Sequence, residues 1–212
     1  MKKSTKISLA ATLAVFIIFS VLYANGFLSS YEKTISDRLY SEKKGFDGII
    51  IIAIDDKSIQ SIGRWPWDRD VYAEYLERMK KAKVIGIDIS FFEPSAKDEF
   101  LKKFIEKENI VLASEFSDSV LLKPIFNAQH GYANIYLDSD DVARSIITKK
   151  GDEKSFSAMI LEKYANKSTD EKIIINFFSF DSMPFSDILE KNESYFDGKI
   201  GLVFFKNEKK WH

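Results

Sequence analysis

The feature that most constrains this chain is a long apolar segment near its amino terminus. No charged side chain occurs from residue 7 up to Glu32. A helix of about 20 residues, rising 1.5 Å per residue, crosses the roughly 30 Å hydrocarbon core of a bilayer. Three lysines lie in residues 1–6, and positive charge favours the cytoplasmic side. We therefore expect a cytoplasmic tail at 1–6, a transmembrane anchor at 7–28 and an extracytoplasmic remainder.

A cleaved signal peptide is the alternative interpretation of this segment. The small residues at positions 24–26 would suit a signal peptidase. We favour the uncut anchor, because the apolar run is longer than the core of about 7 to 15 residues typical of signal peptides. A buried core helix fits poorly, because residues 15–22 are apolar on nearly every face. The anchor and the signal peptide both predict export.

Composition bounds the rest of the chain. With 212 residues, 45% of them hydrophobic, there is room for about one globular domain plus a segment or two. Because 31 basic residues balance 32 acidic ones, the charge gives no general attraction to nucleic acid. There is no cysteine, and the histidines are His130 and His212, so disulfides, thiolate zinc sites and multi-histidine metal sites are excluded. We predict no cofactor, no resident metal and no nucleic-acid partner.

A polar stalk is expected at 29–48, and a sparse apolar stripe in its middle predicts a helix there. After the stalk, apolar runs alternate with amphipathic segments. The first half of the domain is predicted to contain strands at 49–54, 84–89 and 110–113 and helices at 71–83 and 97–107. The first is a continuous run of mostly β-branched residues, the pattern of a strand covered on both faces, and the second is predicted to be another buried strand that ends near carboxylates. The order strand, helix, strand, helix, strand with short joins predicts parallel pairing through right-handed crossovers.

The second half of the domain is less regular. It is predicted to contain strands at 132–137 and 143–148 joined by the polar turn 138–141, a helix at 155–165 capped by Ser155, a buried strand at 172–178, a short helix at 185–191 and a buried strand at 199–205. The chain is therefore predicted to be α/β: a transmembrane helix followed by one extracytoplasmic domain, 49–205, with a mainly parallel central sheet. Residues 206–212 form a tail.

Acidic side chains follow two of the predicted strands. Asp55 and Asp56 come after the first strand, and Asp88 ends the second. The carboxyl ends of parallel strands open on one crevice, so we expect these side chains to lie close together. They would form either a pocket for a hard cation or cationic ligand, or caps for the helices that follow. We favour capping, because adjacent residues of an extended chain point to opposite sides.

The stretch GRWPWDRD, residues 63–70, joins the first strand region to the next helix. The proline favours an extended residue before it and fits ahead of a helix, Asp68 is placed to cap that helix, and Asp70 suits the positive end of its dipole. Helix initiation does not explain Trp65 and Trp67, which we expect to pack on a neighbouring element or to line a cleft.

The two arginines of this stretch are predicted to pair with the strand-end acids across the same crevice. A polar cluster with an aromatic lip would result, suited to an unknown small-molecule or protein ligand. The predicted ligand-binding residues are Asp55, Asp56, Arg64, Trp65, Trp67, Arg69 and Asp88.

Sequence motifs for catalysis are missing. A haloacid-dehalogenase-like phosphatase needs acids two apart after the first strand, but Lys57 occupies that position. The lysine and hydroxyl residue that a receiver domain places after later strands are not found, nor are GxGxxG, GxxxxGK[ST] and GxSxG. His130 is interpreted as a turn residue rather than a catalytic base. We predict no catalysis; the alternative is a metal-dependent phosphohydrolase using the strand-end carboxylates.

The segment IIIIAIDDKSIQSIGRWPWDRDVYAEYLERMKKAKVIGIDISFFEP resembles the opening of the second CHASE-type family, extracytoplasmic sensory domains associated with cyclases, histidine kinases and serine/threonine kinases. The resemblance continues in order through GYANIYLDSDDVARSI, SFSAMI, INFF, MPFSDILEKN and GKIGLV, over about residues 31–203. It implies an N-terminal membrane helix, an exported α/β sensor, further membrane helices and a cytoplasmic output domain, with ligands that are generally undefined.

The sequence departs from the family pattern after GKIGLV. The family continues there with a small-residue loop, an aspartate and a Thr-Pro pair, whereas this chain ends in FFKNEKKWH. We interpret it as a truncated, single-pass sensor in the cell membrane that contacts the lipid bilayer through 7–28 and signals through an output-domain partner or a homodimer. A non-functional remnant of a split receptor is the alternative.

Overall fold

The computed structural model describes residues 3–27, 35, 43–138, 140–175, 178–180 and 182–205. Most of the predicted stalk and the whole predicted tail at 206–212 lie outside the described residues. The chain divides into two compact units, Met1–Lys43 and Lys44–His212. Each unit is described by itself below.

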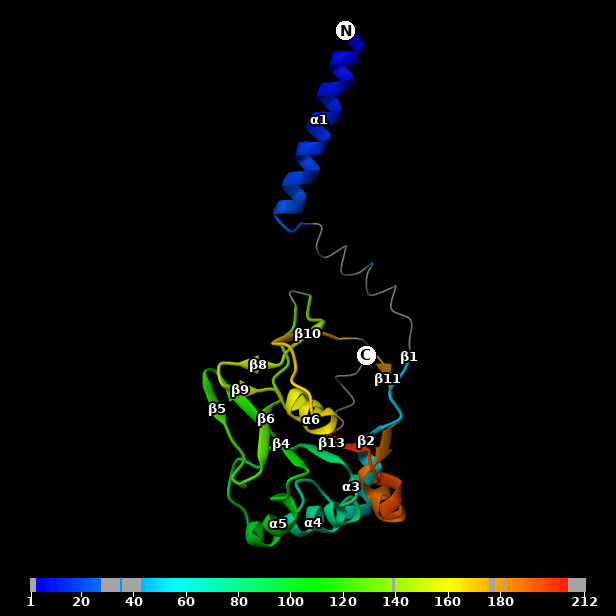
Figure 1. Cartoon of the computed structure of the whole chain (residues 1–212), viewed down its shortest axis with the longest axis vertical. Coiled ribbons are helices and arrows are strands. Elements are labelled where there is room, and N and C mark those ends of the chain that lie inside the picture. Colours follow the sequence, from blue (N-terminus) through cyan, green and yellow to red (C-terminus); the bar gives the residue numbers. More distant parts are fainter. Residues whose placement is uncertain are drawn as a thin grey trace. The chain divides into compact units, whose positions relative to one another are not determined.

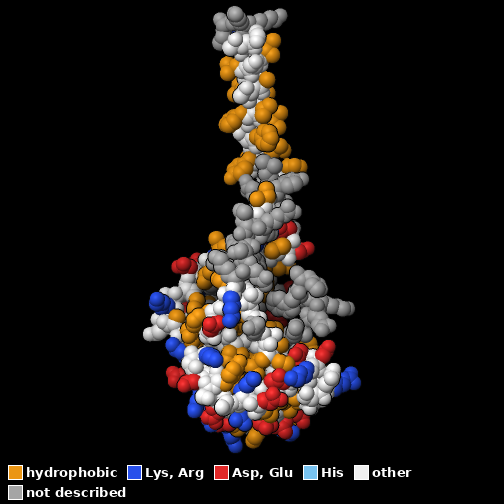
Figure 2. Space-filling view, turned by 90° about the vertical axis from the view of Figure 1, so that its right-hand side faces the viewer, with side chains coloured by type: hydrophobic (Ala, Val, Ile, Leu, Met, Phe, Trp, Pro, Cys, Tyr) orange, Lys and Arg blue, Asp and Glu red, His pale blue; other side chains and the backbone are white. Residues whose placement is uncertain are grey.

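The first unit carries the helix α1 (Lys3–Ala24). Its 22 residues extend about 33 Å at 1.5 Å per residue, enough to cross a bilayer core. Among the described residues, α1 is the helix that is long and apolar enough to span a membrane. Figure 2 shows apolar side chains along this helix, whereas acidic and basic side chains are interspersed on the visible face of the second unit. The predicted membrane-span candidate followed by an α/β domain is confirmed.

A seven-stranded, mainly parallel sheet forms the centre of the second unit. Its strands follow the order β12, β2, β13, β3, β4, β5, with β6 paired to β4. Their bounds are β2 Ile49–Ile54, β3 Val84–Asp88, β4 Ile110–Ser117, β5 Val120–Leu122, β6 Gln129–Tyr132, β12 Ser182–Pro184 and β13 Ile200–Phe205. The neighbouring pairs of this sheet are parallel except β4 with β5. The predicted mainly parallel central sheet is confirmed.

The strand β13 lies between β2 and β3. Its Val203 is opposite Ile52 on one side and Ile87 on the other. Because neighbouring strands are about 4.8 Å apart, the ends of β2 and β3 are separated by roughly 10 Å. The sequence led us to expect that the acids after these two strands lie close together. Because β13 separates the strands, they are not on adjacent strands.

Helices cover both faces of this sheet (Figure 1). The helices α3 (Asp56–Ile62), α4 (Arg69–Arg78) and α5 (Asp98–Ile105) lie on one face, and α6 (Phe156–Ala165) lies on the other. Two short 3-10 helices, η1 (Phe185–Glu190) and η2 (Glu193–Phe196), contribute Phe185 and Phe196 to the larger core.

The buried part of β3, residues 84–87, has no polar side chain because both of its faces are covered. Ile85 and Ile87 belong to the larger core with α4 and α5, whereas Val84 packs in a smaller core with Ile160 of α6. Alternate side chains of a strand point to opposite faces, so a strand covered on both faces is apolar at successive positions. At Gly86 an added Cβ would lie 2.5 Å from Ile160, so the glycine lets α6 approach the sheet closely.

The predicted helices are present with shifted ends, whereas α3 was not placed by the sequence prediction. The helix predicted at 71–83 is α4, which starts two residues earlier and stops at Arg78. It stops there because Ala82 donates to the Met79 carbonyl at 2.8 Å, a turn that leads directly into β3. The predicted cap of α6 is confirmed, since Ser155 Oγ accepts from the Ala158 amide at 3.2 Å.

The second half of the domain differs from the prediction. The strands predicted at 132–137 and 143–148 do not pair with each other: β6 ends at Tyr132 and pairs with β4, and β7 (Ser145–Ile147) pairs with β10 (Lys172–Ile174). A buried strand at 172–178 is also wrong, because all three residues of β10 are exposed. The remaining strands are β1 Lys43–Lys44, β8 Lys149–Lys150, β9 Glu153–Lys154 and β11 Phe178–Ser179.

Candidate functional site

Two cavities adjoin at the carboxyl edge of the sheet. The ladder between β3 and β4 ends at the pair Ile87 and Leu112, and beyond it the two strands border a hollow. We call the first the tryptophan cavity; its volume is about 320 Å³, and it is lined by Trp65, Pro66, Trp67, Arg69, Tyr72, Asp88, Ile89, Ser90 and Phe205. Four of the seven predicted ligand-binding residues therefore line one cavity.

The second cavity, which we call the acidic cavity, has a volume of about 200 Å³. It is lined by Asp88, Ser90, Phe92, Ala113, Ser114, Glu115, Ala133 and Asn134. Asp88 and Ser90 line both cavities, so the two form one crevice with Asp88 at its middle. Sheets of parallel strands commonly bind ligands at this edge.

The tryptophans of the crevice have different environments. Trp67 is 7% exposed, and its Nε1 donates to the Gly63 carbonyl at 2.7 Å. Trp65 is half-buried, and its ring centroid lies 5.2 Å from that of Trp67 and 5.3 Å from that of Phe205. Trp67 is thus a core residue, whereas Trp65 forms the accessible wall of the tryptophan cavity.

Arg69 does not pair with the strand-end acids, contrary to the prediction. Its Nε donates to Asp98 of α5 at 2.8 Å, and a terminal nitrogen donates to the Glu93 carbonyl at 3.1 Å. The guanidinium carbon lies 4.7 Å from the centroid of the Phe91 ring. The Arg69 side chain is only 13% exposed and is fixed by these contacts, so its charge has a structural role.

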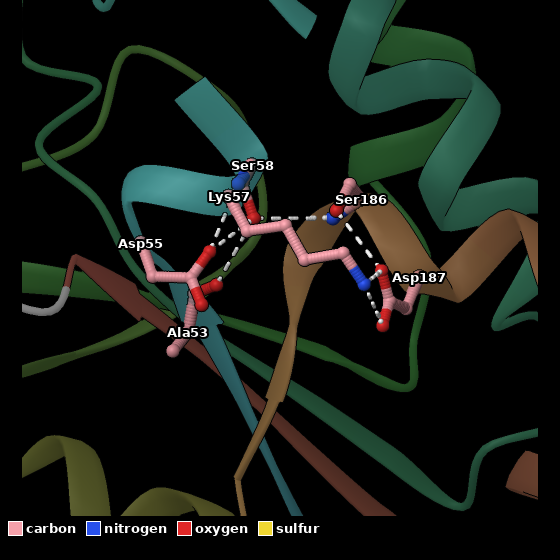
Figure 3. Close-up of polar contacts among 6 residues, drawn as sticks. All are labelled: Ala53, Asp55, Lys57, Ser58, Ser186 and Asp187. Carbon is pink, nitrogen blue, oxygen red and sulfur yellow. Dashed lines mark hydrogen bonds and ion pairs between the residues drawn. The ribbon is translucent and has the colours of Figure 1, made fainter. Parts of the chain in front are cut away.

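Asp55 caps α3, as the favoured interpretation predicted. Its Oδ1 accepts from the Ser58 amide at 2.9 Å and from the Ser58 hydroxyl at 2.8 Å (Figure 3). Ser58 Oγ in turn accepts from the Ser186 amide at 3.2 Å, and Lys57 forms an ion pair with Asp187 at 2.7 Å. This network ties α3 to η1, so Asp55 has a structural role.

Three of the predicted ligand-binding residues lie outside both cavities. Asp55 is directed toward Ser58, and Asp56 and Arg64 are exposed at the two ends of the α3 region. The predicted side-chain cap by Asp68 is also wrong: the residue is at the N-cap of α4, but its carboxylate accepts from Lys97 at 3.2 Å. His130 lies in β6 and not in a turn.

A larger groove of about 630 Å³ lies along α4 and α5, away from this crevice. Three of the four acids that line it have cationic partners: Asp70 pairs with Lys97 at 2.7 Å, and Glu77 and Glu193 each pair with Lys80 at 2.9 Å. The hydrogen bond from Lys97 lowers the pKa of Asp70. We place the candidate site at the crevice, because it lies at the carboxyl edge of the parallel sheet and contains four of the predicted ligand-binding residues.

Comparison with models of protein families matches the CHASE2 domain over residues 11–207. The chain belongs to the CHASE2 family. CHASE2 domains are extracellular sensory domains of signalling receptors, which confirms the resemblance seen in the sequence. No curated protein and no solved structure matches the chain in the corresponding comparisons. An apolar N-terminal helix together with a CHASE2 domain fits a single-pass membrane protein.

The carboxylate of Asp88 has an unfavourable electrostatic environment in this CHASE2 domain. Its pKa is raised above 3.8, chiefly because the surrounding protein removes water from the carboxylate and also because Glu115 repels its charge. The side chain nevertheless reaches solvent through the crevice. Within the part of the chain that the structure describes, no cation pairs with Asp88 or with Glu115. The crevice therefore holds two uncompensated carboxylates.

Replacing Asp88 by asparagine should stabilise the CHASE2 domain at neutral pH. The folded domain keeps the Asp88 proton at pH values where the unfolded chain, with a pKa near 3.8, has lost it. Stability therefore falls as the pH rises from 3.8 through the raised pKa, whereas the asparagine side chain of the variant cannot ionise. Thermal midpoints of both proteins should coincide below pH 3.8 and diverge above it. A lower midpoint for D88N at neutral pH would contradict this account.

Sequence reasoning missed Tyr72, Glu115 and Asn134 at the crevice. Glu115 could have been predicted from the sequence, because it comes shortly after the apolar run 110–113, in the same way as Asp88 lies near the end of the strand predicted before it. Nothing in the sequence indicated Asn134. Its Oδ1 accepts from the Phe116 amide at 2.7 Å and its Nδ2 donates to the Phe116 carbonyl at 3.0 Å, a contact between residues 18 positions apart.

Proposed function

We propose that this chain is a membrane-anchored sensor that detects a small molecule outside the cytoplasm and has no catalytic activity of its own. Its membership in the CHASE2 family is the observation that carries the proposal. The crevice supports it further, because the tryptophan cavity combines an aromatic wall with one carboxylate, a pattern typical of small-molecule pockets. Trp65 and Asp88 are the residues to which we assign ligand contact.

The competing phosphohydrolase function needs strand-end carboxylates that converge on one metal ion. The described residues do not bring them together: Asp55 is bonded to Ser58, and β13 separates its strand from that of Asp88. Magnesium-dependent hydrolysis of phosphate esters that is lost in Asp55→Asn would favour the enzyme over the sensor.

We further propose the membrane arrangement that the sequence predicts, with residues 1–6 in the cytoplasm, 7–28 in the bilayer, a stalk at 29–48 and the sensor at 49–205. The three lysines within residues 1–6 support this orientation. Signalling would then pass to an output-domain partner or between two copies of the chain, as suits a family of receptor domains.

A reporter fusion tests this arrangement. Alkaline phosphatase folds only outside the cytoplasm and green fluorescent protein fluoresces mainly inside it, so a phosphatase fused after Phe205 should be active and a fluorescent protein at the same junction dark. The control lacks residues 1–28 and should reverse both signals. Fluorescence with an inactive phosphatase in the full chain would place the domain in the cytoplasm and refute the proposed function.

A further inference from the structure

We propose that the second unit contacts the lipid surface with the end at which the chain enters it, inserting exposed apolar side chains among the headgroups. This inference rests on the proposed function, in which α1 lies in the bilayer, and it adds the surface by which the domain itself contacts that bilayer. We call this surface the apolar end. It is formed by Ile135, Leu137, Ile173, Ile174, Phe178 and Phe180.

The exposure of these residues is the first argument. Each of the six is between 37% and 73% exposed, and Ile174 is the most exposed large apolar residue among those described in the second unit. Ile173 and Ile174 are consecutive in β10 and point to opposite faces of it, so neither face of this strand is covered. Gathered apolar side chains on a surface mark sites where a protein or a membrane binds.

Separate segments of the chain are brought together at this end. The strand β10 pairs with β7, and β11 pairs with β1. The amide of Asp138, directly after Leu137, donates to the Val142 carbonyl at 2.9 Å, which closes a turn between residues 133–137 and the chain that enters β7. Figure 1 shows β1, β10 and β11 at one end of the second unit, and α4 and α5 at the other end.

The course of the chain identifies lipid as the occupant of this surface. At β1 the chain that follows α1 enters the domain, and beside it the Gly45 amide donates to the Ser179 carbonyl of β11 at 2.9 Å. Fifteen residues, 28–42, separate β1 from Phe27, the last described residue after α1. A segment of that length spans at most about 50 Å when extended and about 22 Å as a helix. The apolar end is therefore the part of the domain that is tethered nearest to the bilayer.

The chemistry of the apolar end suits a lipid surface. Isoleucine, leucine and phenylalanine side chains insert favourably at the boundary between headgroups and acyl chains, and this requires no complementary shape in the partner. Lys172 is exposed in the same strand as the two isoleucines, and its long side chain reaches toward headgroup phosphates.

Charge contributes less to this contact than apolar insertion. Two of the three acids in the adjoining turn are paired, because Arg144 contacts Asp138 at 3.1 Å and Asp140 at 2.8 Å. The third, Asp141, is exposed, as are the lysines of β8. Since both signs of charge are present, apolar contact is expected to drive binding, and the surface should bind lipid that carries no net charge.

Spin labelling of the full chain tests the proposal. The chain has no cysteine, so one introduced cysteine accepts one nitroxide label. The labelled protein is placed in phosphatidylcholine nanodiscs at one copy per disc, and power saturation measures collisions of the label with oxygen, which concentrates in lipid, and with a nickel chelate, which stays in water. The label at Ile174→Cys should show a severalfold higher ratio of oxygen to nickel collisions than the label at Phe100→Cys, a residue 45% exposed on α5.

Glutamate substitutions test whether the isoleucines hold the domain on lipid. With the label at Leu137→Cys, the double variant Ile173→Glu and Ile174→Glu should lower the ratio to that of the Phe100→Cys label, because charged side chains do not insert among apolar groups. Val120→Glu is the control: Val120 is 65% exposed in β5 of the central sheet, and its substitution should leave the ratio at Leu137→Cys unchanged.

Four results would overturn the proposal. They are a label at Ile174→Cys that nickel reaches as readily as the one at Phe100→Cys, a label shielded from both reagents by protein, shielding that appears only in discs with two copies, and an unchanged ratio in the double glutamate variant. The third would make a second copy the occupant. A label at Phe16→Cys in α1 should collide with oxygen in every case. Nickel access there would instead refute the anchor, and with it the proposed function.

Discussion

Replacing Phe185 by alanine should lower the free energy of unfolding by about 3–5 kcal/mol, the usual cost of deleting a fully buried aromatic ring. Phe185 is 2% exposed at the start of η1. Its ring stacks on Tyr75 with centroids 4.2 Å apart and lies 5.3 Å from the ring of Trp67. Few neighbours can move into the space, because η1 is also held by the hydrogen bond that the Ser186 amide donates to Ser58 Oγ.

Urea unfolding of the full chain in detergent, followed by near-ultraviolet circular dichroism, measures this loss. Phe100→Ala is the matched control, because that phenylalanine of α5 is 45% exposed and leaves little cavity when removed. If the two variants lost equal stability, Phe185 would not be the contact that ties η1 to α4. The same variant should also alter the tryptophan cavity, since Trp67 loses its closest aromatic neighbour on η1.

The sequence predicted which segments form the parallel sheet but not their complete order. The runs 49–54, 84–87 and 110–113 contain no polar side chain, which indicates burial on both faces and hence strands within a covered sheet. That pattern carries no information about neighbours. The insertion of 200–205 between β2 and β3 depends on packing between distant segments, and no local signal encodes it.

Exposed strands were predicted poorly for a related reason. The run 172–178 is as apolar as the buried strands, yet Ile174 of β10 is 73% exposed. Hydrophobicity predicts burial only where another element is present to cover the strand. Here β10 pairs with β7, itself half-exposed, and not with the central sheet.

At the candidate site, interactions within a few residues were predictable and those across the fold were not. The cap by Asp55 spans three residues, and its chemistry follows from the residue type before a helix. Arg69 instead pairs with Asp98, 29 residues away, which the sequence could not distinguish from Asp88. The gathering of Trp65 and Asp88 was predicted, because Asp88 ends a strand at the edge of the sheet where the segment containing Trp65 was expected to border the same crevice.

Gly131 permits the close docking of α6 on β6, and this contact borders the acidic cavity through Ala133 and Asn134. A Cβ at Gly131 would lie 2.7 Å from the amide nitrogen of Phe156 and equally close to the carbonyl carbon and oxygen of Ser155. These are main-chain atoms at the N-terminus of α6, so no side-chain rotation relieves the overlap. The helix or the strand must shift.

Gly131→Ala should therefore destabilise the domain by about 1–3 kcal/mol, the typical cost of overpacking, and should weaken any ligand bound at the acidic cavity. Gly201→Ala in β13 is the matched control, because its added Cβ would lie at an ordinary 3.6 Å from Ile52 and Met79. Alanine there also restricts the unfolded chain, so this variant should be as stable as the wild type or slightly more so. Urea unfolding of both variants compares the two strands directly. Equal stability of the two would mean that α6 does not rest on the main chain of β6, and that the position of Asn134 at the crevice has another origin.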